Sequence, residues 1–354
     1  MSRRQTRRRL AVGLVLLLLL LLVALFALGH GSYPLDSRQV LAALRAGPAA
    51  SDTAAHVIWS IRLPRLLAAV LAGIGLGLAG AVMQGALRNP LASPMTLGVS
   101  QGAAFGATCA IVLFGAGEVH RLGPDALVVH RPSLVVAAAL AGGLGSAGAI
   151  LLIALLRGLH PAALVLAGIA LGAFANAGTM VVQYFAAETE VAATLFWTFG
   201  DLGKAGWPEV AWLALTALPA LSWLSLGAAG GLNALAWGED SARALGVAVA
   251  PLRLSVLALG AAVAAVATAL LGVIGFVGLI APHLVRLLIG PDQRWLLPYA
   301  ALAGALVLLG ADTIGRLVIA PAMLPVGAVT ALLGAPLLLA LLLRPSGTGH
   351  ERFG

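Results

Sequence analysis

The chain has 354 residues, of which 61% are hydrophobic and 10% are charged, and its formal net charge is +8. A soluble domain is about half apolar and a quarter charged, so this composition favours a protein with many membrane-spanning helices. The basic excess does not indicate nucleic-acid binding, because the arginines are scattered and aromatic residues make up only 5% of the chain. The single cysteine, Cys109, excludes a disulfide framework within the chain.

Long uncharged runs follow one another along the chain, and a helix needs about 20 apolar residues to cross the hydrocarbon core. Most runs hold one helix, whereas the run 254–285 is long enough for two and is divided by glycines between Gly272 and Gly275. The sequence therefore predicts an all-α polytopic membrane protein with ten transmembrane helices within residues 10–344. The runs are 10–29, 66–87, 89–117, 132–156, 158–187, 210–238, 254–285, 295–311 and 317–343.

The first nine residues are strongly basic and precede an apolar run of about 20 residues, longer than the hydrophobic region of a signal peptide. We therefore expect a retained first helix. With the N-terminus in the cytoplasm, thirteen basic residues fall in cytoplasmic segments and eight outside, as the positive-inside rule requires. The residues before the first helix, the tail 345–354 and the segment 232–248 are then all expected in the cytoplasm.

The chain lacks the sequence patterns of an enzyme that binds nucleotide or metal. Its one lysine, Lys204, has neither the glycine spacing nor the following Ser or Thr of a phosphate-binding loop, and no His/Cys metal pattern occurs. We therefore expect no cofactor bound by this chain. Ser100 lies in a G-x-S-x-G stretch, but a nucleophile elbow needs a strand before it, and here an apolar helix begins. An intramembrane hydrolase using Ser100, His283 and Asp312 is the remote alternative.

A secondary transporter coupled to protons or sodium is the stronger alternative, because such carriers use buried acids to bind their coupling ion. Asp312 is the main candidate, although it can also pair with Arg316 at i,i+4 near a helix end. Glycines spaced by four predict close helix contacts. These pairs are Gly73 and Gly77, Gly102 and Gly106, and Gly168 and Gly172.

The segment 232–247, LNALAWGEDSARALGV, interrupts the apolar runs with charged residues. It reads as two short helical pieces: the first ends at Gly238, and the second begins with the acids Glu239 and Asp240 and stops at Gly246. The second piece carries a small apolar face. Such a surface could dock into a groove on a soluble partner, and a surface loop without a partner is the equally weighted alternative.

Four stretches of the chain resemble the FecCD-type permease family of type II ABC importers, which carry iron–siderophore complexes, haem and cobalamin. They are RLPRLLAAVLAGIGLGLAGAVMQGALRNPLASPMTLGVSQGAAFGA at 62–107, the segment 232–247, GVIGFVGLIAPHLVRLLIG at 272–290, and LPVGAVTALLGAPLLLALLLR at 324–344. The resemblance implies a ten-helix, non-enzymatic subunit in a bacterial cytoplasmic membrane. It implies a second permease, usually a copy, two cytoplasmic ATPases that bind ATP and Mg²⁺, and a periplasmic or lipid-anchored binding protein.

The resemblance also implies roles for particular residues. The segment 232–248 corresponds to the element that contacts the ATPase, with Leu235, Gly238, Glu239, Asp240, Arg243, Leu245 and Gly246. Three arginines correspond to positions that meet the binding protein: Arg62, Arg65 and Arg316. The cytoplasmic gate corresponds to Asn89, Pro90, Leu91, Pro161 and Ala162, and the pathway to Gln84, Asn176, Thr179 and Gln183.

The residues by themselves leave alternatives open for these roles. Arg62 and Arg65 could anchor the chain at the membrane interface, and Arg316 could form an internal pair with Asp312. The polar residues Gln84, Asn176 and Gln183 could hydrogen-bond neighbouring helices instead of lining a path. The predicted function is the permease subunit of an ATP-driven importer of an iron chelate or haem, with cobalamin as the alternative cargo of the same machine.

Overall fold

The computed structural model describes residues 3–31, 33–50, 52–116, 131–157, 161–319 and 322–342, and within them it contains helices and turns but no strand. The predicted tail at 345–354 lies outside these residues. The helices are α1 Arg3–Gly29, α2 Ser37–Ala46, α3 Thr53–His56, η1 Val57–Arg62, α4 Leu63–Leu87, α5 Val99–Leu113, α6 Pro132–Arg157, α7 Pro161–Tyr184, α8 Glu188–Thr198, η2 Leu202–Lys204, α9 Trp207–Trp223, η3 Leu224–Ala228, α10 Ala229–Leu235, α11 Glu239–Ala244, α12 Val249–Leu271, α13 Val277–Ile289, α14 Gln293–Leu317 and α15 Val326–Leu342.

Seven helical stretches are long and apolar enough to cross a membrane, counted over the described ranges. The shorter apolar helices α5, α13 and α15 occupy the other three predicted runs. The all-α polytopic fold is thus confirmed, while three of the ten predicted spans are shorter than expected. The division of the run 254–285 is also confirmed, because α12 ends before Gly272 and α13 begins after Phe276.

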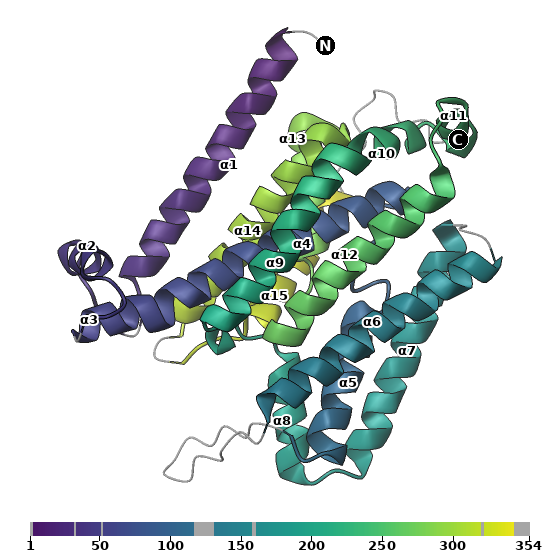
Figure 1. Ribbon diagram of the computed structural model, residues 1–354. Helices are drawn as coiled ribbons and strands as arrows, with labels where there is room; N and C mark the ends of the chain where they lie inside the picture. Colours follow the sequence, from purple (N-terminus) through teal and green to yellow (C-terminus); the bar gives the residue numbers. More distant parts are fainter. Residues whose placement is uncertain are drawn as a thin grey trace.

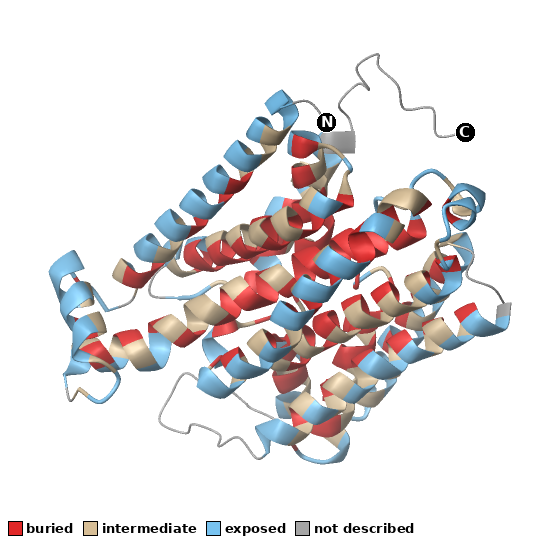
Figure 2. Ribbon diagram, turned by 45° about the horizontal axis from the view of Figure 1, so that its top comes forward, coloured by how far each residue is buried: buried red, intermediate tan, exposed pale blue. Residues whose placement is uncertain are grey.

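Helix α4 forms the centre of the bundle (Figures 1 and 2). It packs against α9, α12, α13 and α14, and 89% of its most apolar window is buried. The helices α5, α6, α7 and α8 form a second group that joins the first mainly through α12. By contrast, α1 and α7 are mostly exposed, with 22% and 17% of their windows buried, so they offer apolar surface to lipid or to another chain.

Glycines allow the central helices to approach closely. A Cβ added at Gly73 or Gly77 would meet the backbone of α14, and one added at Gly102 or Gly106 would meet the backbone of α6. A Cβ at Gly168 would meet the backbone that precedes α5. These contacts confirm the helix packing predicted from the glycine spacing, and van der Waals contact at such positions stabilises helix association in membranes.

Two helices extend beyond their predicted ends. The helical stretch that contains α4 begins at Thr53, and α14 continues to Leu317. Arg62, Arg65, Asp312 and Arg316 therefore lie inside helices, whereas the uncharged-run criterion placed them in outside segments. The criterion misses them because it treats every charge as a helix boundary, and paired charges can be accommodated within a packed bundle.

The bundle has two distinct ends, which we name the α11 end and the α2 end (Figure 1). The beginning of α1 lies at the α11 end, where Arg9 forms an ion pair of 3.0 Å with Asp292 in the turn between α13 and α14. Asn233 of α10 contacts the same carboxylate. These contacts agree with the sequence-based grouping of the N-terminal residues and the segment 232–248 on one side of the membrane.

Candidate functional site

The helix α11 is separated from its neighbours by two glycines with left-handed backbone angles. Gly238 precedes it with φ of 111°, and Gly246 follows it with φ of 80°. Side-chain-bearing residues rarely adopt these angles, so the glycines permit sharp turns on both sides. The predicted start at Glu239 and stop at Gly246 are confirmed. The preceding piece differs from expectation, because α10 continues the long helix that starts at Trp207.

An apolar cluster fixes α11 to the bundle. Leu235, Ala242 and Val249 are buried together, with Leu235 completely inaccessible. The resemblance places Leu235 among the residues that contact an ATPase. In the structure its side chain instead supports α11 from beneath, so any contribution to a partner contact is indirect.

The opposite side of α11 is exposed. Leu245 is 70% exposed, and Asp240 is fully exposed while its carboxylate accepts a hydrogen bond of 3.1 Å from Arg243. Trp237, just before the helix, is 81% exposed. Sequence reasoning missed Trp237, although a lone aromatic residue beside a charged turn is a signal for an interface, where tryptophan is enriched.

A buried arginine connects α11 to the end of α4. Arg253 of α12 is 1% exposed, and its Nη2 lies 2.8 Å from a carboxylate oxygen of Glu239. Its Nε donates a hydrogen bond of 3.0 Å to the carbonyl oxygen of Ala86. Sequence reasoning counted Arg253 only as a topology signal, because nothing in a linear sequence relates it to residues so far away.

A second polar cluster lies where α10 meets α14. Asp292 caps α14 by accepting from the backbone N–H of Arg294, and it also accepts hydrogen bonds from Asn233 and Arg9. Partial burial by itself would raise the pKa of Asp292, but these three donors and the charge of Arg9 outweigh it and hold the pKa below its usual value. The carboxylate therefore stays ionised at neutral pH and links α1, α10 and α14.

The predicted gate residues follow the end of α4. Arg88 adopts a left-handed conformation with φ of 48°, and the side chain of Asn89 then accepts a hydrogen bond of 2.9 Å from the backbone of Leu91. Leu91 is 47% exposed. Pro161 begins α7 and Ala162 is exposed, at the same end of the molecule as α11.

At the α2 end, one aspartate joins two arginines. Asp312 is 2% exposed, Arg65 donates to it from Nη2 at 2.8 Å and from Nε at 3.0 Å, and Arg316 donates to it at 3.1 Å. The i,i+4 pair predicted for Asp312 and Arg316 is confirmed. With both oxygens occupied by guanidinium groups, Asp312 is poorly placed to bind a coupling ion or assist a serine nucleophile.

Arg62 joins the same region through the backbone. Its guanidinium donates to the carbonyl oxygens of Leu28 and Tyr33, and its side chain is buried. It therefore connects η1 to the turn that follows α1. The three arginines that the resemblance assigns to receptor docking thus lie close together, but in this structure each makes bonds within the chain.

The four predicted pathway residues occupy two places. Gln84 is 3% exposed and bridges α4 to α13, accepting from Arg286 at 2.9 Å and donating to the carbonyl of Gly278. On α7, Asn176 is exposed, whereas Thr179 bonds its own helix and Gln183 donates to Thr194 of α8 at 2.7 Å. Gln84 therefore makes the interhelical hydrogen bonds that the residues alone left as an alternative.

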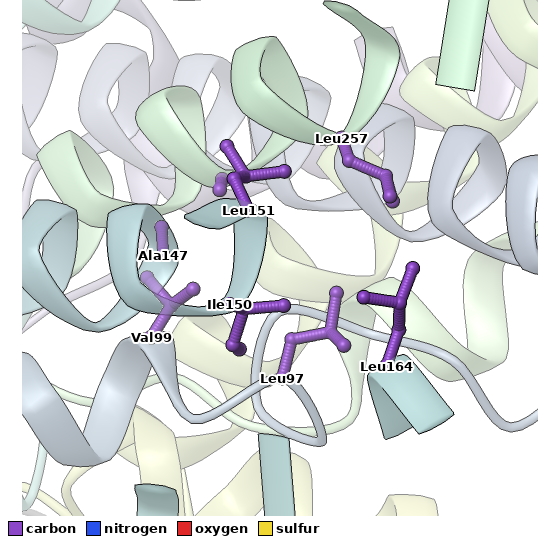
Figure 3. A pocket seen from close by; sticks show the side chains of 8 residues that line it. Leu97, Val99, Ala147, Ile150, Leu151, Leu164 and Leu257 are labelled. Carbon is purple, nitrogen blue, oxygen red and sulfur yellow. The ribbon is translucent and has the colours of Figure 1, made fainter. Parts of the chain in front are cut away.

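A small apolar cavity lies between the two helix groups (Figure 3). Its volume of about 10 Å³ is close to the minimum for one water molecule. It cannot hold a cargo molecule. The side chains around it come from the segment before α5 and from α5, α6, α7 and α12: Leu97, Val99, Ala147, Ile150, Leu151, Leu164, Leu257 and Ala261.

Comparison with known proteins relates this arrangement to transport. Residues 17–344 match the model of the FecCD transport family. The chain is 39% identical to the hemin transport system permease protein HmuU of Yersinia pestis, covering 83% of this chain and 85% of the relative. It is 36% identical to the Fe(3+)-citrate import system permease protein YfmE of Bacillus subtilis, covering 96% and 97% of the two chains.

Other relatives extend the range of cargoes. The chain is 40% identical to the vitamin B12 import system permease protein BtuC of Klebsiella pneumoniae, covering 82% and 84%. A solved inward-facing structure of a transporter assigned to the metal-chelate ABC type superposes with a TM-score of 0.79 and 34% identity, covering 93% of this chain and 97% of the other. The chain therefore belongs to the FecCD transport family and is the permease subunit of an ABC importer.

Proposed function

We propose that this permease works with two ATPase subunits, a second permease chain and a substrate-binding protein to import an iron chelate or haem, driven by ATP. The observation that carries the proposal is the construction of α11. It is a short charged helix held on the bundle by Leu235 and Arg253, with Trp237 and Leu245 exposed beside it. A short helix that is fixed on its inner face and exposes aromatic and aliphatic side chains on its outer face is the arrangement of a docking element.

The ATPase would contact α11 through both apolar and charged groups. Trp237 and Leu245 supply the apolar contacts, and Asp240 and Arg243 supply rim charges that orient the partner. Glu239 faces inward toward Arg253, so it belongs to the support of the helix. ATP and Mg²⁺ would bind on the partner subunit, and hydrolysis of the ATP would displace α11.

The binding protein would approach the α2 end. Arg65 and Arg316 both pair with Asp312, whereas the guanidinium of Arg62 bonds only backbone carbonyls among its described partners, so the three arginines carry more positive charge than Asp312 neutralises. This potential would attract an acidic receptor surface even while the internal bonds persist. The measurable consequence is an association rate that falls steeply as ionic strength rises.

A second copy of the chain would pack beside α7. Its residues Leu164, Gly168 and Gly172 are buried, and the two glycines lie against α5 and the segment before it. Phe174 and Met180 are 75% and 69% exposed. Asn176 lies on the exposed part of the same helix, where a polar residue suits a path between two copies better than lipid. Cysteine introduced for Met180 in a Cys109→Ser background should crosslink two copies, whereas cysteine for Leu22 on α1 should not.

The cargo proposal rests on the chemistry that the relatives share. Their names include hemin, iron citrate and vitamin B12, all of which are metal chelates. Iron chelates and haem are the first candidates, and cobalamin is the alternative that uses the same subunits.

Reconstitution tests the proposal. Vesicles containing the permease, its ATPase and its binding protein should accumulate hemin, ferric citrate or cobalamin only with internal ATP, and dissipating ion gradients should not stop uptake. Permease alone should accumulate none of them. Uphill accumulation by permease alone would refute the proposed function, and a preference for cobalamin would refute only the cargo.

A further inference from the structure

The end of α4 and the helix α11 are far apart in sequence, yet one buried side chain connects them. Arg253 of α12 contacts Glu239, the first residue of α11, and Ala86, the penultimate residue of α4. Its side chain is nearly inaccessible. A buried guanidinium is stable only when it is paired and hydrogen-bonded, so these contacts restrain its position strongly.

The carbonyl group of Ala86 makes this contact structurally specific. The last four carbonyl groups of a helix have no partner within the helix, and a cation near the helix C-terminus is also favoured by the helix dipole. Arg253 therefore supplies a cap to α4 from a neighbouring helix. The helix ends directly afterwards at Arg88, which has a left-handed backbone conformation, and the chain continues into the predicted gate loop at Asn89.

On the other side, Glu239 couples Arg253 to the exposed surface. One carboxylate oxygen faces Arg253 at 2.8 Å, and the other accepts from Arg243 at 3.0 Å. Arg243 is 60% exposed, so a chain of charge-assisted bonds runs from the surface of α11 to the end of α4.

We propose that Arg253 is a positioning residue that fastens α11 to the end of α4, so that the two move as one body when the ATPase displaces α11. The inference rests on the proposed docking of the ATPase at α11. Without this connection, α11 would still bind the ATPase, but its movement would reach the gate loop less completely. Loss of Arg253 would thus reduce cargo import for each ATP hydrolysed.

The first test measures the connection in the purified permease without any partner. In a Cys109→Ser background, spin labels at Arg88→Cys and Ala244→Cys should give one narrow distance distribution. Glu239→Gln, which keeps the size of the side chain, and Arg253→Gln should each broaden or shift it. The matched control is Arg294→Gln, which removes an exposed arginine at the same end and should leave the distribution unchanged.

The second test uses the assembled transporter in vesicles. With ATP and vanadate, the distance between the two labels should stay constant in the otherwise unsubstituted protein and change in Glu239→Gln. The cargo is whichever of hemin, ferric citrate or cobalamin the vesicles accumulate. Glu239→Gln should lower the amount of this cargo imported per ATP hydrolysed by about tenfold, within the usual range for coupled sites, while ATP hydrolysis continues.

The outcomes separate this inference from the proposed function. A distance distribution as narrow in Glu239→Gln as in the parent protein would overturn the inference, whether or not transport occurs. The inference would also be overturned if the distance between the two labels in the parent protein changed on addition of ATP and vanadate. If Arg253→Gln fails to fold, Glu239→Gln still provides the test. Failure of the complete transporter to import with ATP would instead overturn the proposed function, because the partner-free measurement does not require it.

Discussion

The two ends of the bundle contain pairs of the same design in different surroundings. Glu239 and Arg243 at the α11 end, and Asp312 and Arg316 at the α2 end, are both acid–arginine pairs at i,i+4. In the first pair the arginine is 60% exposed, and in the second it is 9% exposed and the acid 2%. The same spacing thus produces a surface available to a partner in one place and an internal connection in the other.

The difference follows from what surrounds each pair. Asp312 faces Arg65 from α4 as well as Arg316, so its charge is neutralised by two helices. A buried charge that loses its partner retains the desolvation penalty without compensation, whereas water replaces a lost partner at the surface. Substitutions at the two ends should therefore have effects of very different size and kind.

The largest effect on stability is expected for Asp312→Ala. It leaves Arg65 and Arg316 buried without their carboxylate, so the free energy of unfolding should fall by about 3–5 kcal/mol. Denaturant unfolding in detergent measures this change. Asp240→Asn is the matched control, because Asp240 is fully exposed, and its stability should equal that of the parent protein. Equal stability of the two variants would contradict the assigned difference between the ends.

The next largest effect concerns binding at the α11 end. Trp237→Ala should weaken association with the ATPase by about 2 kcal/mol, roughly thirtyfold, as expected for an aromatic residue at the centre of an interface. The thermal stability of the Trp237→Ala variant should equal that of the parent protein, because the side chain of Trp237 is 81% exposed. Trp212→Ala, on the exposed face of α9, serves as the control and should leave ATPase affinity unaltered.

A smaller effect is expected for Asp292→Asn, which keeps an N-cap oxygen for α14 but removes the negative charge that pairs with Arg9. The cost should be about 1 kcal/mol at neutral pH, the upper end for an ion pair that solvent can reach. Because the pKa of Asp292 is lowered in the folded protein, its contribution is complete above the unfolded value of about 3.9 and is lost as pH falls through the folded value.

The pH dependence provides the measurement. Parent protein and Asp292→Asn should differ in unfolding midpoint at pH 7 and converge as the solution becomes more acidic than pH 4. A constant difference down to pH 2 would show that the ionised carboxylate is not the source of the stabilisation.

The smallest effect on stability is expected for Arg243→Gln. An exposed i,i+4 pair contributes at most about 0.5 kcal/mol, so unfolding should be almost unchanged. Arg316→Gln tests the same spacing where the pair is buried and should cost several times more. If both substitutions cost the same, burial does not distinguish the two pairs.

The sequence predicted the polytopic fold because long apolar runs leave few alternatives to a membrane helix. It also predicted the boundaries of α11, because Gly238 and Gly246 permit backbone angles that end a helix on either side, and acids favour its first turn. Arg316 was predicted to pair with Asp312 because i,i+4 spacing is a local property.

The sequence did not predict which charged side chains are buried. Arg65 with Asp312, Arg253 with Ala86 and Arg286 with Gln84 are all separated by more than a hundred residues, so only helix packing brings them together. For the same reason the sequence did not show that Leu235 is buried and that Trp237 is exposed.

The sequence by itself determined that this chain is a helical membrane protein with a short charged helix at one end and no nucleotide-binding loop. Local composition and glycine positions suffice for those conclusions. The tertiary structure decided which arginines are exposed and which connect helices, because the environment of a charge depends on the solvent and counter-charges that distant segments leave around it.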